Sequence, residues 1–108
     1  MGLAISEQLA QPFWDSDLQR LDGDLILAIG GAPEEAEARY HRALEIARAQ
    51  EAKSFELRAA TSLARLWRDQ GKGAAARNLL APVYAWFTEG FDTGDLTDAK
   101  SLLDQLSG

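Results

Sequence analysis

Residues 63–83 read LARLWRDQGKGAAARNLLAPV, the pattern of two antiparallel helices joined by a tight turn. Ala64 is a small residue where two helices can touch, and the aromatic Trp67 follows one turn later. Gly71 then supplies the turn, because glycine adopts the left-handed conformation that ends a helix at low cost. The second helix carries its small and apolar residues at a helical spacing, at Ala76, Leu80 and Val83.

A weaker copy of this pattern lies earlier in the chain, over 23–43. The matched pairs are Gly23 with Ala64, Gly30 with Gly71, Ala36 with Ala76, and Tyr40 with Leu80. A small residue, an aromatic residue, a turn glycine and a second helix with small residues are typical of the tetratricopeptide repeat. Such a unit cannot bury its apolar face alone, so it stacks on neighbours and forms a concave surface that binds other proteins.

Helical periodicity and the presence of only three prolines predict an all-α chain. We expect one tetratricopeptide-like domain over residues 1–108, a helical repeat stack of about two helix pairs with a capping C-terminal helix. A short helix is also expected over 3–10. The expected units are repeat one at 14–51 (helices 14–29 and 34–51), repeat two at 54–89 (helices 54–70 and 74–89), and the capping helix at 95–106.

Apolar stripes indicate which helix faces pack against a core. In the helix expected at 14–29 the stripe is Trp14, Leu18, Leu21, Leu25 and Ile29. In the helix expected at 54–70 the inward residues are Leu57, Ala60, Leu63, Ala64 and Trp67. The last helix has one apolar and one polar face, as a terminal capping helix requires. Trp86 lies off the main stripe of its helix and is expected to contribute less to stability than Trp67.

Composition limits the classes of function. The chain has no cysteine, which excludes a disulfide scaffold and a cysteine nucleophile. A net charge of −6, with a pI near 4.6, argues against nucleic-acid binding. No apolar run approaches the ~20 residues that span a bilayer, and the first residues lack the basic region of a signal peptide. We therefore expect a cytoplasmic protein that is not an enzyme and binds no cofactor, metal, nucleic acid or membrane.

Three stretches resemble a known family. They are AEARYHRALEIA at residues 36–47, KSFELRAATSLARLW at 53–67, and LAPVYAWFTEGFDTGDLTDAKSLL at 80–103. Together they resemble the C-terminal tetratricopeptide-repeat region of bacterial adenylate/guanylate cyclase-associated AAA-type ATPase regulators. The resemblance covers roughly residues 12–106. It implies a scaffold or sensor role without chemistry, since no phosphate-binding G-x-x-x-x-G-K-[ST] motif occurs here.

A row of polar residues on the helix expected at 54–70 is the candidate binding site. The first helix of each tetratricopeptide pair lines the concave groove, and arginine side chains bind carboxylates with two parallel hydrogen bonds. The alternative is an ordinary solvated face, with the arginines paired to Glu45, Glu51 or Asp69. The row is Arg58, Thr61, Arg65 and Arg68, and the matching row on the helix expected at 14–29 is Asp17, Arg20, Asp24 and Leu27.

Two other features have simpler interpretations. His41 is the only histidine, so it cannot build a metal site alone, and we interpret it as a surface residue. The spacing Asp92-x-x-Asp95-x-x-Asp98 lacks the geometry of a calcium-binding loop. We expect Asp92, Thr93 and Asp95 to cap the last helix instead.

The leading hypothesis is a non-enzymatic protein–protein interaction module whose groove takes a protein or peptide, favouring acidic or C-terminal ones. The alternatives are a detached regulatory tail of a cyclase/ATPase signalling protein, and a remnant without independent function. Apolar residues near the N-terminus also predict a two-fold homodimer through that end. These residues are Leu3, Ile5, Leu9, Phe13 and Trp14.

Overall fold

A computed structural model describes residues 14–87 and 94–107, without the side chains of residues 14, 15 and 107. The helix expected at 3–10 lies outside these residues. The described residues form five α-helices, so the all-α prediction is confirmed, and helix α5 ends three residues earlier than expected. The helices are α2 (Trp14–Ala28), α3 (Pro33–Ala49), α4 (Lys53–Asp69), α5 (Gly73–Trp86) and α6 (Gly94–Ser107).

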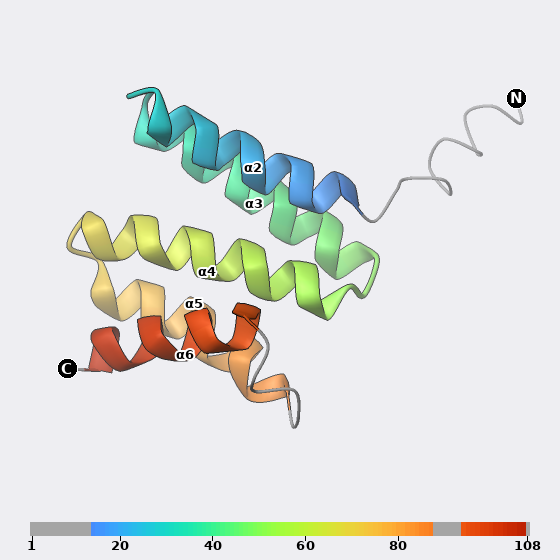
Figure 1. The fold of residues 1–108 in the computed structure, drawn as a ribbon, viewed down its shortest axis with the longest axis vertical. Coiled ribbons are helices and arrows are strands. Elements are labelled where there is room, and N and C mark those ends of the chain that lie inside the picture. The colour runs from blue at the N-terminus through green and yellow to red at the C-terminus, as the bar shows by residue number, and fades with distance from the viewer. Residues whose placement is uncertain (1–13, 88–93, 108) are drawn as a thin grey trace, which may run out of the picture.

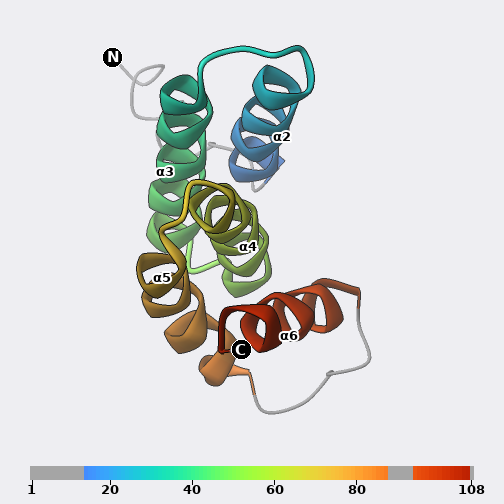
Figure 2. The ribbon, with the colours of Figure 1, turned by 90° about the vertical axis from the view of Figure 1, so that its left-hand side faces the viewer.

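The helices pack in two layers. Figure 2 shows α2, α4 and α6 on one side of the molecule and α3 and α5 on the other. Each helix contacts the next one in the chain, and α4 also contacts both α2 and α6 (Figure 1). Helix α4 is therefore the centre of the fold. A surface that crosses the first layer is built from α2, α4 and α6.

The turns after α2 and α4 have the same conformation. Gly30 has φ +80° and Gly71 has φ +79°. In each turn the following residue closes the helix end, since the N–H of Gly31 donates to the carbonyl of Ile26 and that of Lys72 to Trp67, both at 2.7 Å. This left-handed glycine followed by a closing hydrogen bond is the Schellman motif. The sequence correspondence between the two helix pairs thus extends to their turns.

The turn after α3 has the same form without a glycine. Glu51 has φ +54°, and the N–H of Ala52 donates to the carbonyl of Ala47 at 2.8 Å. A residue with a Cβ is strained in the left-handed region by roughly 1–2 kcal/mol. Glu51 is therefore a point of backbone strain between the two helix pairs.

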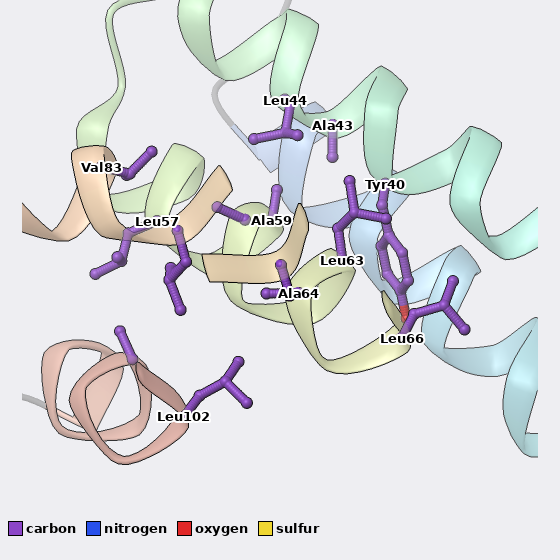
Figure 3. Close-up of a cluster of buried hydrophobic side chains, with 14 of the residues drawn as sticks. Tyr40, Ala43, Leu44, Leu57, Ala59, Leu63, Ala64, Leu66, Val83 and Leu102 are labelled. Carbon is purple, nitrogen blue, oxygen red and sulfur yellow. The ribbon is translucent and has the colours of Figure 1, made fainter. Parts of the chain in front are cut away.

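The core forms where α3, α5 and α6 pack around α4 (Figure 3). Its largest fully buried apolar side chains are Tyr40, Leu57, Leu63 and Leu80. Helix α6 has one apolar and one polar face, as predicted, and α3 also buries one face. The fully or nearly fully buried residues of those two helices include Ala36, Tyr40, Ala43, Leu44, Ala47, Leu96, Ala99 and Leu102.

Helices α2 and α3 approach each other at Gly23. A Cβ placed on Gly23 would lie 2.6 Å from Cε1 of Tyr40 and 3.0 Å from two other ring atoms. Carbon atoms in contact lie about 3.5–4.0 Å apart, so only glycine fits beside this ring. Ser16 is also buried on this face and donates a hydrogen bond to the carbonyl of Ala43 at 2.8 Å.

Two expectations for apolar residues were wrong. The stripe on α2 faces away from the rest of the domain, with Leu18, Leu21, Leu25 and Ile29 all exposed. Ser16 and Gly23 face α3 instead, because Gly23 allows the close approach to Tyr40 and Ser16 bonds the carbonyl of Ala43. Trp67 is only partly buried, since its indole N–H donates at 3.1 Å to Glu37 at the edge of the core.

Candidate functional site

A hollow of about 220 Å³ lies on the layer formed by α2, α4 and α6. Four residues of the predicted polar rows line it, one from α2 and three from α4. Ser62, Asp95 and Asp98 also line it, and sequence reasoning did not place them there. The complete lining is Arg20, Arg58, Thr61, Ser62, Arg65, Asp95 and Asp98.

Arg58 is held by two carboxylates from different helices. Its Nε donates to Asp95 of α6 at 2.8 Å, and its Nη1 lies 3.6 Å from Asp17 of α2. The hydrogen bond to Asp95 raises the pKa of Arg58, which partial burial opposes. The guanidinium also lies 5.4 Å from the centre of the Phe55 ring, within cation–π distance. Arg58 therefore links the three helices of the layer and has little capacity left for an external anion.

Arg20 is similarly engaged on α2. It bonds Asp17 at 2.9 Å and Asp24 at 3.2 Å. Asp24 also accepts a hydrogen bond from the hydroxyl of Tyr40, and burial together with this bond raises the pKa of Tyr40. The structure thus joins the predicted residues Asp17, Arg20 and Asp24 into one network, which connects through Asp17 to Arg58.

Arg65 differs from its neighbours. Its side chain is exposed, and no residue of the described chain forms a hydrogen bond or ion pair with it. It stands one and two helical turns beyond Thr61 and Arg58 on α4, at the rim of the same hollow. Among the three arginines of the hollow, Arg65 is therefore the one whose five N–H donors are not used by any residue of 14–87 or 94–107.

The other two members of the row have local partners. Arg68 does not line the hollow, and it bonds Asp69 at 3.1 Å and also donates to Gln105 of α6. The pairing with Asp69 agrees with the solvated-face alternative, whereas the partners of Arg58 are Asp95 and Asp17. Thr61 is buried, and its hydroxyl donates back to the carbonyl of Leu57 at 2.8 Å.

The capping role expected for Asp95 was wrong. Helix α6 begins at Gly94, so Asp95 lies inside the first turn, where its carboxylate receives the bond from Arg58. Asp92 and Thr93 lie outside the described residues. The signal for the real role of Asp95 is not local, because its partner Arg58 belongs to a different helix.

A second hollow, of about 300 Å³, lies against α3, α4 and α5, and sequence reasoning missed it. The buried carboxylate of Glu56 accepts bonds there from Arg48 at 3.1 Å and from Lys53 at 3.3 Å. The ammonium of Lys53 lies 5.4 Å from the exposed ring of Trp86. Glu56 is the one carboxylate among the described residues that line this hollow, and Arg48 and Lys53 already neutralise it. These charges therefore pair with one another and give no sign of a ligand site.

His41 is exposed, as expected. Its Nε2 lies 3.6 Å from Glu37, and its ring centre lies 6.0 Å from that of Trp67. Across residues 14–87 and 94–107, no group of three or more His, Asp or Glu side chains is placed to hold a metal ion. Within the same ranges, no helix has both the length and the apolarity to cross a membrane.

Comparison of the chain with protein-family models, with curated proteins and with solved structures found no match. The fold and the hollow define a small all-α domain of five packed helices, counted over the described residues, with a charged surface across its first layer.

Proposed function

We propose that this chain is a short tetratricopeptide-like stack that acts as a non-enzymatic protein-interaction module. The surface of α2, α4 and α6 binds a partner protein through an acidic side chain or a C-terminal carboxylate. The observation that carries the proposal is Arg65, an exposed guanidinium that no described residue pairs, at the rim of a hollow whose other arginines are already held. The matched turns after α2 and α4 support the repeat interpretation.

The ligand chemistry follows from the lining. Three arginines and two aspartates surround the hollow, so its positive charge is mostly neutralised within the chain. One carboxylate fits the remaining cation at Arg65, because a guanidinium binds a carboxylate with two parallel hydrogen bonds. A polyanion such as RNA is a poor fit, because Asp95 and Asp98 line the same hollow and the chain carries a net charge of −6.

Paired peptides test this proposal. Short fluorescent peptides of random sequence are made with a free C-terminal carboxylate or with an amide, and with Asp or Asn inside the sequence. Anisotropy then selects the peptides that the full chain binds. We expect the peptides that bind to carry a carboxylate. We also expect Arg65→Ala to weaken their affinity by about tenfold or more, because a charged hydrogen bond contributes ~1.5–3 kcal/mol.

Arg77→Ala is the matched control, because Arg77 is an exposed arginine on α5 in the other layer. The double change Arg65→Glu with Arg68→Glu abolishes binding, while the thermal midpoint stays nearly constant. Binding to carboxylate peptides also weakens with added salt, since exposed charges are screened beyond ~8–10 Å. Binders that tolerate Arg65→Ala as well as Arg77→Ala would contradict the proposal, as would the absence of any carboxylate-dependent binder.

A second candidate function is the regulatory tail of a larger cyclase/ATPase signalling protein. The observation that favours it is the exposed apolar stripe of α2. In a repeat stack each unit packs an apolar face against its neighbour, so an uncovered apolar face indicates that a further unit of a larger protein packs there. The resemblance of residues 36–47, 53–67 and 80–103 points to the same class. The two candidates are compatible, since the stripe and the charged hollow occupy different faces of α2.

A further inference from the structure

The outer face of α2 carries an uncovered row of apolar side chains. Leu18 is 50% exposed, Leu21 47%, Leu25 58% and Ile29 74%. They recur at helical spacing on one side of the helix, so they form one continuous strip. Exposed contiguous apolar surface of this kind usually marks an interface.

The second helix pair shows what this face is suited to bind. Aligning Gly23 with Ala64 and Gly30 with Gly71 relates each position of α2 to one of α4. Four positions that are exposed on α2 are buried on α4. The related pairs are Leu18 with Ala59, Leu21 with Ser62, Asp22 with Leu63, and Leu25 with Leu66.

On α4 this face packs against the preceding helix pair. Figure 3 shows Leu63 and Leu66 beside the side chain of Tyr40, which comes from α3, and Ala59, Leu63, Leu66, Tyr40 and Leu44 all belong to one buried cluster. The same face of α2 has no covering element in the part of the chain that the structure describes. By this correspondence, the ligand that fits the outer face of α2 is another helix.

Asp22 indicates which charge the docking helix must carry. Its counterpart Leu63 is fully buried at the centre of the contact between α4 and α3. A helix docked on α2 in the same way covers the Asp22 carboxylate, and an unpaired buried carboxylate is costly. We propose that the outer face of α2 docks an amphipathic helix of a partner protein, which packs on Leu18, Leu21 and Leu25 and pairs a lysine or arginine with Asp22.

Charge also disfavours two other possible occupants of this face, a second copy of the chain and the chain's own N-terminal residues. In a two-fold dimer through this face, Asp22 approaches Asp22 of the second copy, and α2 carries four aspartates against one arginine. Residues 1–13 contain Glu7 and neither lysine nor arginine, so these residues have no basic side chain to offer Asp22. A basic helix from another protein satisfies both the apolar strip and the carboxylate.

Two synthetic helical peptides test the proposal on the full chain. Both are about three heptads long with leucine at the a and d positions, and they differ only in lysine or glutamate at the positions beside the leucines. We expect one lysine peptide to bind per protein molecule, at least tenfold more tightly than the glutamate peptide. Asp22→Lys reverses this preference, and circular dichroism checks that the fold of each variant is unchanged.

The double change Leu21→Ser with Leu25→Ser should weaken the affinity for the lysine peptide by tenfold or more. Trp86→Ser is the matched control, because Trp86 is an exposed apolar residue on α5, and it leaves binding unchanged. Equal binding of the two peptides, or equal loss in Trp86→Ser, would overturn the proposal by showing non-specific adsorption.

Two further results would also overturn it, each in favour of another occupant. One is a dimer in sedimentation that Leu21→Ser with Leu25→Ser dissolves, which assigns the face to a second copy. The other is a chain that binds the lysine peptide only after Ile5→Ser with Leu9→Ser, which assigns the face to the chain's own N-terminal segment. A monomer that binds the lysine peptide without these changes supports the proposal.

Discussion

The contact between Gly23 and Tyr40 sets the spacing of the first helix pair, so Gly23→Ala tests the packing directly. An added Cβ lies 2.6 Å from a ring carbon of Tyr40, about 1 Å closer than carbon atoms in contact approach. Overpacking of this kind costs about 1–3 kcal/mol. Replacing a helical glycine by alanine returns up to ~1 kcal/mol in helix propensity.

Subtracting the second value from the first leaves roughly 0–2 kcal/mol. Because the clash at 2.6 Å is severe, we expect the net loss for Gly23→Ala in the upper half of this range, at about 1–2 kcal/mol. For a domain of this size it lowers the thermal midpoint by roughly 5–15 °C. The measurement is chemical and thermal unfolding followed by circular dichroism. Gly73→Ala is the matched control, since a Cβ at Gly73 lies 3.8 Å from Leu106, an ordinary contact, and the midpoint should hardly move.

A double change distinguishes a clash with the ring from a general intolerance of alanine. The second helix pair has Ala64 and Leu80 where the first has Gly23 and Tyr40. Gly23→Ala with Tyr40→Leu therefore copies the second pair into the first, and we expect it to be more stable, by about 1 kcal/mol or more, than the sum of the single changes predicts. Additive losses would refute the reasoning, and so would a Gly23→Ala variant as stable as Gly73→Ala.

Two further predictions concern Glu51 and Tyr40. Glu51→Gly should raise the free energy of unfolding, measured in urea, by about 0.5–1 kcal/mol. The reason is that Glu51 has φ +54°, a conformation that glycine adopts without strain. A loss of stability would show that the left-handed turn is not strained. Burial, followed by the bond to Asp24, raises the pKa of Tyr40, so the folded state keeps a proton that the unfolded state releases near pH 10. Stability from this residue is complete below pH 10 and falls as pH rises beyond it. Tyr40→Phe should flatten the decline between about pH 9 and 11, and an unchanged slope would contradict the assignment.

The sequence predicted the helices well because their signals are local. The turn glycines and the helical periodicity of the apolar residues all act within one or two helical turns. Gly30 and Gly71 were matched by spacing alone, and the structure gives them nearly equal φ angles. The all-α class follows from such signals without knowledge of distant contacts.

The orientation of α2 could not be predicted in the same way. Its leucine stripe is as regular as that of α6, yet it faces outward, because periodicity identifies an apolar face without identifying what covers it. The buried residues described on this helix are Ser16 and Gly23, and their roles depend on Ala43 and on the ring of Tyr40 at the other side of the contact. Only the distant partner distinguishes these two faces.

The charged hollow was predicted in part for a similar reason. The helical spacing placed Arg58, Thr61 and Arg65 on one face correctly. It could not indicate that Arg58 would be neutralised by Asp95 of α6 and Asp17 of α2, which are both distant in the sequence. Since a guanidinium accommodates several carboxylates, the partners of an arginine are determined by the packing of whole helices. Of the three arginines in the predicted row, Arg65 therefore remains as the candidate for binding a ligand.

Helix α2 connects the two proposed surfaces. Its inner side supplies Arg20 to the hollow and Asp17 to the bond with Arg58, while its outer side carries the apolar strip. On the side that faces α3, the described residues Ser16 and Gly23 are buried, with Ser16 bonded to the carbonyl of Ala43 and Gly23 against the ring of Tyr40. A helix docked on the outer face as proposed would also stabilise the position of Asp17, the α2 carboxylate that lies beside Arg58. Under the two proposals, binding at one surface is therefore expected to favour binding at the other, and thermodynamic linkage requires such coupling to be reciprocal.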